Sequence, residues 1–165
     1  QRNLSKQVLT TIFNKQHLSA LHLSSCLLTS SGALVMRQFM SGRFPMPNLY
    51  SLQLNCTGMK TVLTKMQRDN INIVLPRDII CLTLDGSFRS IYPSDLIACL
   101  CSMSNLRFLY THTDLGKSIH SWLLHNYPGT ANGNTGMLRR ISYTPLFSWH
   151  CFEFGAVCTP PSSVG

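Results

Sequence analysis

Leucines recur along the chain in a fixed arrangement of apolar and polar positions. Each occurrence reads apolar-x-x-Leu-x-Leu-x-x-polar, and only Thr111 departs from the second leucine. The four occurrences begin about 30 residues apart and span residues 18–26, 49–57, 79–87 and 106–114. Because alternate residues of a strand point to the same face, each Leu-x-Leu pair predicts a short strand with one buried side. We therefore expect strands near residues 20–24, 51–55, 81–85 and 108–112.

Apolar residues at helical spacing separate these strands. We expect helices at residues 31–40, 59–67, 94–103 and 115–125, and a further helix at 4–13 before the first strand. One strand and one helix cannot enclose a core, so neighbouring units must stack. The sequence therefore predicts an α/β solenoid of about four repeats. The first helix starts close to Gln1 without a recognisable cap, which favours a sequence that continues upstream.

The pattern resembles the leucine-rich repeat. Asn48-Leu49 and Asn105-Leu106 match the asparagine-leucine pair that commonly opens such a strand. The long spacing is similar to that of ribonuclease-inhibitor-like and cysteine-containing repeats. Cys26 stands where the cysteine-containing type carries a cysteine, whereas Cys56 stands one residue early. The resemblance implies a concave parallel sheet, convex helices and a protein partner bound by the concave face.

Long repeats with free cysteines resemble those in substrate receptors of cullin-based ubiquitin ligases. By that resemblance the chain is expected to be a non-catalytic, cytoplasmic recognition segment, with a ubiquitin ligase adaptor bound through segments outside this chain. The alternative is an extracellular or immune-receptor leucine-rich repeat ectodomain. Two glycosylation sequons, which begin at Asn3 and Asn55, favour that alternative.

The repeat pattern ends near residue 128, which divides the chain into a repeat segment, 1–128, and a tail, 129–165. Gly and Asn dominate residues 129–136, and Pro and Ser dominate 159–165, so we expect a loop and a disordered end. Between them, residues 146–154 have the composition of a strand. The tail is either a terminal cap or an extension without a fold of its own.

Composition and charge narrow the range of partners. The 165 residues are 44% hydrophobic, enough for a core, and only 12% charged, with a formal net charge of +8. The cations are scattered, and the tightest cluster is the Arg139-Arg140 pair, so we expect no nucleic acid as partner. No apolar run approaches the roughly 18 residues that cross a membrane, so we expect no membrane association.

No constellation of residues points to catalysis, a cofactor or a metal. The seven cysteines include no C-x-x-C pair of the kind that binds zinc. Residues 116–118, Gly-Lys-Ser, lack the earlier glycine of a P-loop, because Thr111 stands at that position. His150 and Cys151 are adjacent and would face opposite sides of a strand, so they do not form a nucleophile and base pair.

Residues between the buried leucines should form three rows across the concave face. The rows are Ala20, Ser51, Cys81 and Phe108; His22, Gln53, Thr83 and Tyr110; and Ser24, Asn55, Asp85 and His112. They change from small and polar to aromatic, and aromatic residues and arginine are enriched in protein interfaces. The candidate protein-binding residues are His22, Gln53, Asp85, Arg107, Phe108, Tyr110 and His112. The alternative is that the aromatic end packs beneath the next element, for which the tail is the candidate.

Overall fold

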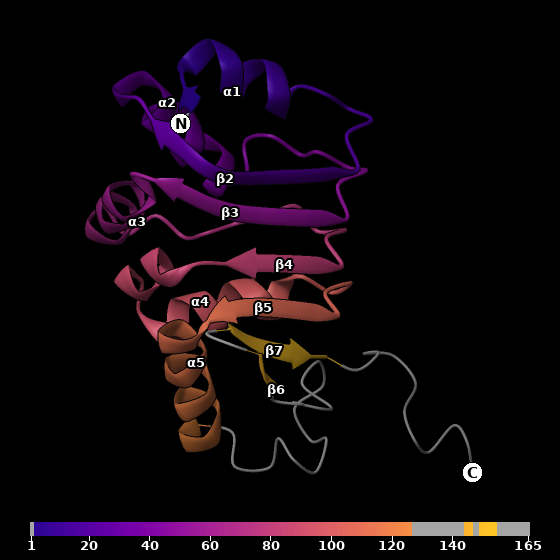
Figure 1. Ribbon diagram of the computed structural model, residues 1–165, viewed down its shortest axis with the longest axis vertical. Helices are drawn as coiled ribbons and strands as arrows, with labels where there is room; N and C mark the ends of the chain where they lie inside the picture. Colours follow the sequence, from indigo (N-terminus) through magenta and orange to yellow (C-terminus); the bar gives the residue numbers. More distant parts are fainter. Residues whose placement is uncertain (1, 127–143, 147–148, 155–165) are drawn as a thin grey trace.

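The computed structural model describes residues 2–126, 144–146 and 149–154, and these form an α/β fold around one mixed sheet (Figure 1). The sheet has seven strands in the order β1-β2-β3-β4-β5-β7-β6. Strands β1 to β5 are parallel and lie in the order in which they occur in the sequence, whereas β7 and β6 run antiparallel. The sheet is therefore mostly parallel, as the strand and helix pattern predicts.

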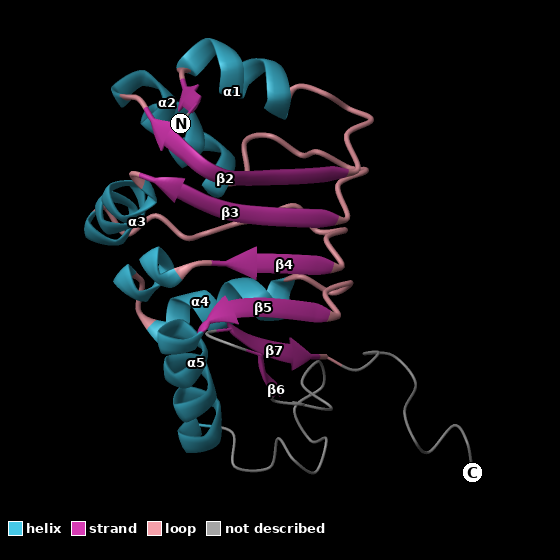
Figure 2. Ribbon diagram, in the orientation of Figure 1, coloured by secondary structure: helices cyan, strands magenta, loops and turns pink. Residues whose placement is uncertain are grey.

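The strands are separated by helices along the parallel part of the sheet (Figure 2). The strands are β1 (Arg2–Leu4), β2 (Ala20–Leu28), β3 (Ser51–Thr57), β4 (Cys81–Leu84), β5 (Phe108–His112), β6 (Thr144–Leu146) and β7 (Trp149–Glu153). The helices are α1 (Lys6–Phe13), α2 (Ser30–Met40), α3 (Met59–Arg68), α4 (Pro93–Ser102) and α5 (Thr113–Asn126), with a short 3-10 helix η1 (Gly86–Ser90). The four strands and five helices expected from the sequence are confirmed within a few residues at each end.

The leucines of the four strands meet in register. Leu52 pairs with Leu21 on one side and with Leu82 on the other, and Leu82 pairs in turn with Leu109. Leu52, Leu82 and Leu109 are at most 1% exposed. The alternation that the sequence predicts is therefore confirmed, with one leucine position of each strand directed into a common core.

The same backbone hydrogen bond recurs just before β3, β4 and β5, and a matching bond follows the end of β7. The amide of Tyr50 donates to the carbonyl of Ser19 at 2.8 Å, and that of Ile80 donates to the carbonyl of Tyr50 at 2.8 Å. Arg107 then donates to Ile80 at 2.9 Å, and Phe154 donates to Arg107 at 2.8 Å. These bonds hold neighbouring strands in register at one end of the sheet.

The first helix differs from the sequence expectation. The structure places β1 at Arg2–Leu4 and begins α1 only at Lys6, after Ser5. The Ser5 hydroxyl accepts a hydrogen bond from the Val8 amide at 3.3 Å, which is an ordinary N-cap. The expected start at residue 4 and the expected absence of a cap are therefore both wrong, because three residues pair with β2 before the helix begins.

Close contact between β1 and α2 requires a glycine. Gly32 lies in the first turn of α2, where a Cβ atom would stand 1.9 Å from the carbonyl oxygen of Leu4. The Thr29 amide donates to that same carbonyl at 3.2 Å, and the Thr29 side chain caps α2 through the Gly32 amide at 3.0 Å. This short edge strand is therefore held by the start of a helix as well as by β2.

The C-terminal part of the sheet comes from the segment predicted as a strand. β7 occupies residues 149–153 and pairs antiparallel with β5, while β6 pairs with β7. The strand expected within 146–154 is therefore confirmed for residues 149–153. The loop expected at 129–136 and the disordered end expected at 159–165 lie outside the described residues, so the division at residue 128 stays a prediction.

Thr111 is the one polar residue in the buried row of β5. It is fully buried, and its hydroxyl has no hydrogen-bond partner within the part of the chain that the structure describes. Its strand neighbours are Leu84 and His150. An unpaired buried hydroxyl costs about 1–3 kcal/mol, so this position lowers the stability of the fold.

Replacing Thr111 by valine should therefore stabilise the protein. We expect Thr111→Val to raise the free energy of unfolding by about 1 kcal/mol, because it removes the unpaired hydroxyl and keeps the branched shape. Urea denaturation followed by circular dichroism measures this. Thr83→Val, on the open side of the neighbouring strand, is the control and should change stability by less than about 0.5 kcal/mol. A loss of stability in Thr111→Val would show that the hydroxyl is satisfied.

Candidate protein-binding surface

Among the described residues, the helices leave one face of the sheet uncovered (Figure 2), and we call it the open face. Strand register confirms its first two rows. Ala20, Ser51, Cys81 and Phe108 form the first, and His22, Gln53, Thr83 and Tyr110 form the second. The alternate residues of the same strands are buried leucines and Thr111, so the pleat directs these rows away from the core.

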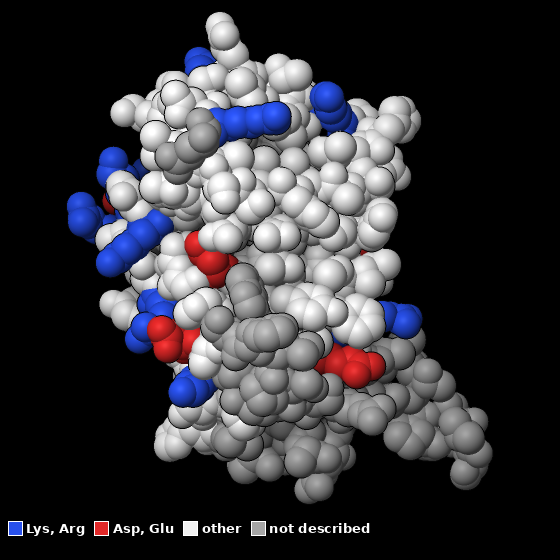
Figure 3. All heavy atoms as spheres, viewed as in Figure 1, with Lys and Arg blue, Asp and Glu red and all other residues white. Residues whose placement is uncertain are grey.

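The open face is polar but almost without charge. His22 is exposed, and its Nε2 lies 3.0 Å from the Ser51 hydroxyl on the next strand. Gln53 and Thr83 continue the second row and are half-buried. Figure 3 shows a white band across β2 to β4, with Lys and Arg above it and along the left edge of the view. Such a surface recognises neutral hydrogen-bonding groups better than ions.

Two aromatic side chains end these rows on β5. Phe108 and Tyr110 are each 36% exposed. Strand β7 lies beside them, with Glu153 paired to Phe108 and Cys151 paired to Tyr110. The tail therefore covers the edge of β5, as the packing alternative supposes, yet both aromatic side chains keep part of their surface in contact with solvent.

The third row holds only in part. Ser24 pairs with Asn55, but β4 ends at Leu84, before Asp85. Asp85 instead caps η1, where its carboxylate accepts a hydrogen bond from the Ser87 amide at 3.1 Å and one from the Ser87 hydroxyl. The expectation that Asp85 continues the row is therefore wrong, because a local turn uses its carboxylate.

His112 and Arg107 lie at opposite ends of β5. His112 is the last residue of the strand, where it pairs with Trp149, and it is half-buried. Arg107 comes directly before the strand and is exposed. It is joined through backbone hydrogen bonds to Ile80, which is joined in the same way to Tyr50. Arg107 therefore belongs to the margin of the open face rather than to its rows.

The sequence pattern did not identify several residues of this surface. Tyr50 and Ile80 are 51% and 39% exposed and stand beside Arg107 along the margin. Their position before each strand could have identified them, since the repeat pattern places the three in equivalent positions. Cys151 and Glu153 could not be found in this way, because no local pattern shows that β7 pairs with β5.

Tyr110 lies between thiols of the two neighbouring strands. Burial raises the pKa of Tyr110, and so do the nearby thiols of Cys151 and Cys81 and a hydrogen bond with Cys151. Burial also raises the pKa of Cys81 and that of Cys151, and for Cys151 the hydrogen bond with Tyr110 acts in the opposite direction. These groups are therefore protonated at neutral pH, and the open face carries no thiolate nucleophile there.

The described residues contain neither a cluster of metal ligands nor a helix that could cross a membrane. Within residues 2–126, 144–146 and 149–154, no group of three or more His, Cys, Asp or Glu side chains could hold a metal ion. Among the helices described, none is long and apolar enough to cross a membrane.

Comparison of the chain with known protein families, curated proteins and solved structures finds no match.

The raised pKa of Tyr110 gives a direct test of the surface geometry. We expect the phenol to ionise at a higher pH than free tyrosine, as seen in the ultraviolet absorbance difference between the protein and Tyr110→Phe. The folded state favours the neutral phenol, so this contribution to stability is present at neutral pH and is lost as the pH rises through the raised pKa. Cys151→Ala should lower the pKa, whereas Cys101→Ala, on the exposed side of α4, should not. An unchanged titration in Cys151→Ala would contradict the contact.

Proposed function

We propose that this chain is a non-catalytic protein-recognition segment of a leucine-rich repeat protein, and that the open face binds the partner. The observation that carries the proposal is the partly exposed pair Phe108 and Tyr110 at the end of two uncharged rows. Exposed aromatic anchors beside neutral hydrogen-bonding groups are typical of the centre of a protein interface.

The repeat character of the proposal has support from the backbone. The four parallel strands β2 to β5 follow one another in sequence order, and β3, β4 and β5 are each preceded by an equivalent backbone hydrogen bond to the residue before the previous strand. The inner leucines of the strands align across the sheet. Stacked strand and helix units of this kind form solenoids whose inner sheet serves as an extended binding surface.

A binding role also agrees with the chemistry of the open face. Its thiols and its phenol have raised pKa values, which is the opposite of what activates a nucleophile. The ring of His22 contacts the Ser51 hydroxyl, but no described carboxylate is hydrogen-bonded to that ring to orient it as a base. We therefore propose recognition rather than catalysis.

The two versions of the proposal, a cytoplasmic protein and an extracellular ectodomain, differ in the cellular compartment. We favour a cytoplasmic protein, such as the substrate-recognition part of a ubiquitin ligase receptor. The six cysteines that the structure describes are all free thiols, and burial raises the pKa of Cys56 and of Cys99 to about 12. The alternative is an extracellular or immune-receptor ectodomain, which the exposed sequon residue Asn3 favours.

Cysteine alkylation and intact-mass measurement of the protein purified from cells that express it distinguish these versions. After denaturation without reductant, we expect an alkylating reagent to label all seven cysteines and the intact mass to show no glycan. Paired cysteines or a glycan on Asn3 or Asn55 would instead support the ectodomain. Either result leaves the proposed open-face interface to be tested separately.

The interface is tested by substitution of its anchors. We expect Phe108→Ala and Tyr110→Ala each to weaken partner capture by about 2 kcal/mol, roughly thirtyfold in affinity. Lys117→Ala on α5 is the control and should leave capture unchanged. The measurement is a pulldown with the tagged chain in which retained proteins are quantified by mass spectrometry.

Thermal melts of each variant separate lost contact from lost fold. Because both aromatic side chains are only partly buried, we expect small changes in melting temperature. If Tyr110→Ala unfolds the chain, the aromatic pair serves packing against β7. If capture survives both aromatic substitutions in a folded chain, the open face is not the binding site.

A further inference from the structure

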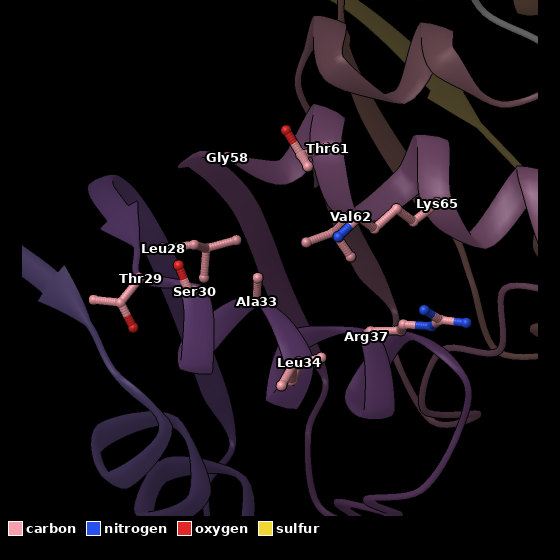
Figure 4. Close-up of a pocket in the computed structure, with 10 residues that line it drawn as sticks. All are labelled: Leu28, Thr29, Ser30, Ala33, Leu34, Arg37, Gly58, Thr61, Val62 and Lys65. Carbon is pink, nitrogen blue, oxygen red and sulfur yellow. The ribbon is translucent and has the colours of Figure 1, made fainter.

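A groove lies between helices α2 and α3, away from the rows of the open face (Figure 4). It has a volume of about 270 Å³. Leu28, Ala33 and Val62 give it an apolar lining, and Leu34 of α2 stands at its mouth with 64% of its surface exposed. The small side chain of Ala33 and the absence of one at Gly58 leave this space unfilled. An apolar hollow beside an exposed leucine is a site where an apolar side chain of a partner can be buried.

The charged residues that line the groove are both cationic. Its ten lining residues include Arg37 and Lys65 and no acid. Arg37 is partly neutralised by Asp69 at 2.6 Å, and in Figure 4 its guanidinium points away from the groove. The Lys65 side chain extends toward Val62 in the same view, and it has no ion pair within the part of the chain that the structure describes. Lys65 therefore offers an available positive charge next to the apolar lining.

A second hollow continues the groove along α2. It shares Leu34 and Arg37 with the first and adds Arg43 and Ile71 at its far end, with a volume of about 340 Å³. No acid lines this hollow either. Helix α2 has 11 residues, which corresponds to about 16 Å, the span of about five residues of extended chain. The two hollows therefore provide both apolar and cationic contacts along α2.

We propose that the groove between α2 and α3 binds a short acidic peptide segment of a protein partner, in which leucine-like side chains alternate with Asp or Glu. The apolar side chains enter the two hollows on either side of Leu34, and the carboxylates face Lys65 and Arg43. Charge complementarity supports this occupant, since no acid lines either hollow and the chain carries a formal net charge of +8. The proposal is independent of the open face.

Binding of synthetic peptides to the full chain tests this site. The probe is a fluorescein-labelled peptide of leucine and glutamate, compared by fluorescence polarisation with a peptide in which lysine replaces glutamate. We expect only the acidic peptide to bind, and added salt to weaken it. Lys65→Glu should weaken binding by about tenfold, whereas Lys117→Glu, the same charge change on α5, should leave it within about twofold.

Filling the hollow provides a second test that does not change charge. Ala33→Leu places a larger side chain in the groove and should weaken the acidic peptide by about tenfold. If this variant does not fold, Thr61→Gln on the opposite, exposed wall takes its place. Tyr110→Ala should leave the peptide affinity unchanged, which separates this site from the open face.

Four outcomes would overturn the proposal. Equal binding of the acidic and basic peptides would show that charge does not select the occupant. Equal weakening by Lys65→Glu and Lys117→Glu, or no effect of filling the hollow, would place the peptide elsewhere. Binding of decanoate that is lost in Ala33→Leu, without binding of the acidic peptide, would assign the groove to a lipid chain.

Discussion

Burial of leucines between neighbouring parallel strands is the interaction on which the rest of the structure depends. Leu52 and Leu82 are almost fully buried, although each belongs to a strand of only a few residues. Burying one such side chain contributes about 1.5–3 kcal/mol, and the contribution requires a neighbouring strand in register. Parallel pairing also requires a crossover connection, which the helices provide while their own apolar residues complete the same core.

This constraint creates a difficulty at both ends of the stack, because an end strand has no neighbour to cover it. At the N-terminal end, β1 pairs with β2 and its Leu4 carbonyl lies against the first turn of α2. At the other end, β7 pairs with β5 in the antiparallel direction and extends the sheet. Exposed edges of sheets promote association with other chains, so these added strands protect the parallel core as well as stabilising it.

The two sides of the molecule differ in their chemistry for the same reason. The strand rows of the open face alternate with buried leucines and carry no Lys or Arg. Lys and Arg are concentrated outside these rows, on the helices and connections, where long side chains can reach water. Our two proposals therefore assign neutral, partly aromatic recognition to the open face and acidic recognition to the groove beside Leu34 and Lys65.

The sequence by itself determined the strands and helices, whose patterns repeat every few residues along the chain. The alternation around Leu52 and Leu82 was enough to predict the four parallel strands, and helical spacing predicted the helices between them, because both patterns depend on residues close together in the chain. The tertiary structure decided the rest. Asp85 does not lie in its predicted row, because its carboxylate accepts hydrogen bonds from Ser87 in a local turn. Strand β7 pairs with β5, and no local pattern in the sequence encodes that pairing. The groove exists only because Ala33 of one helix faces the start of another, and such contacts between distant residues cannot be read from the period of a sequence.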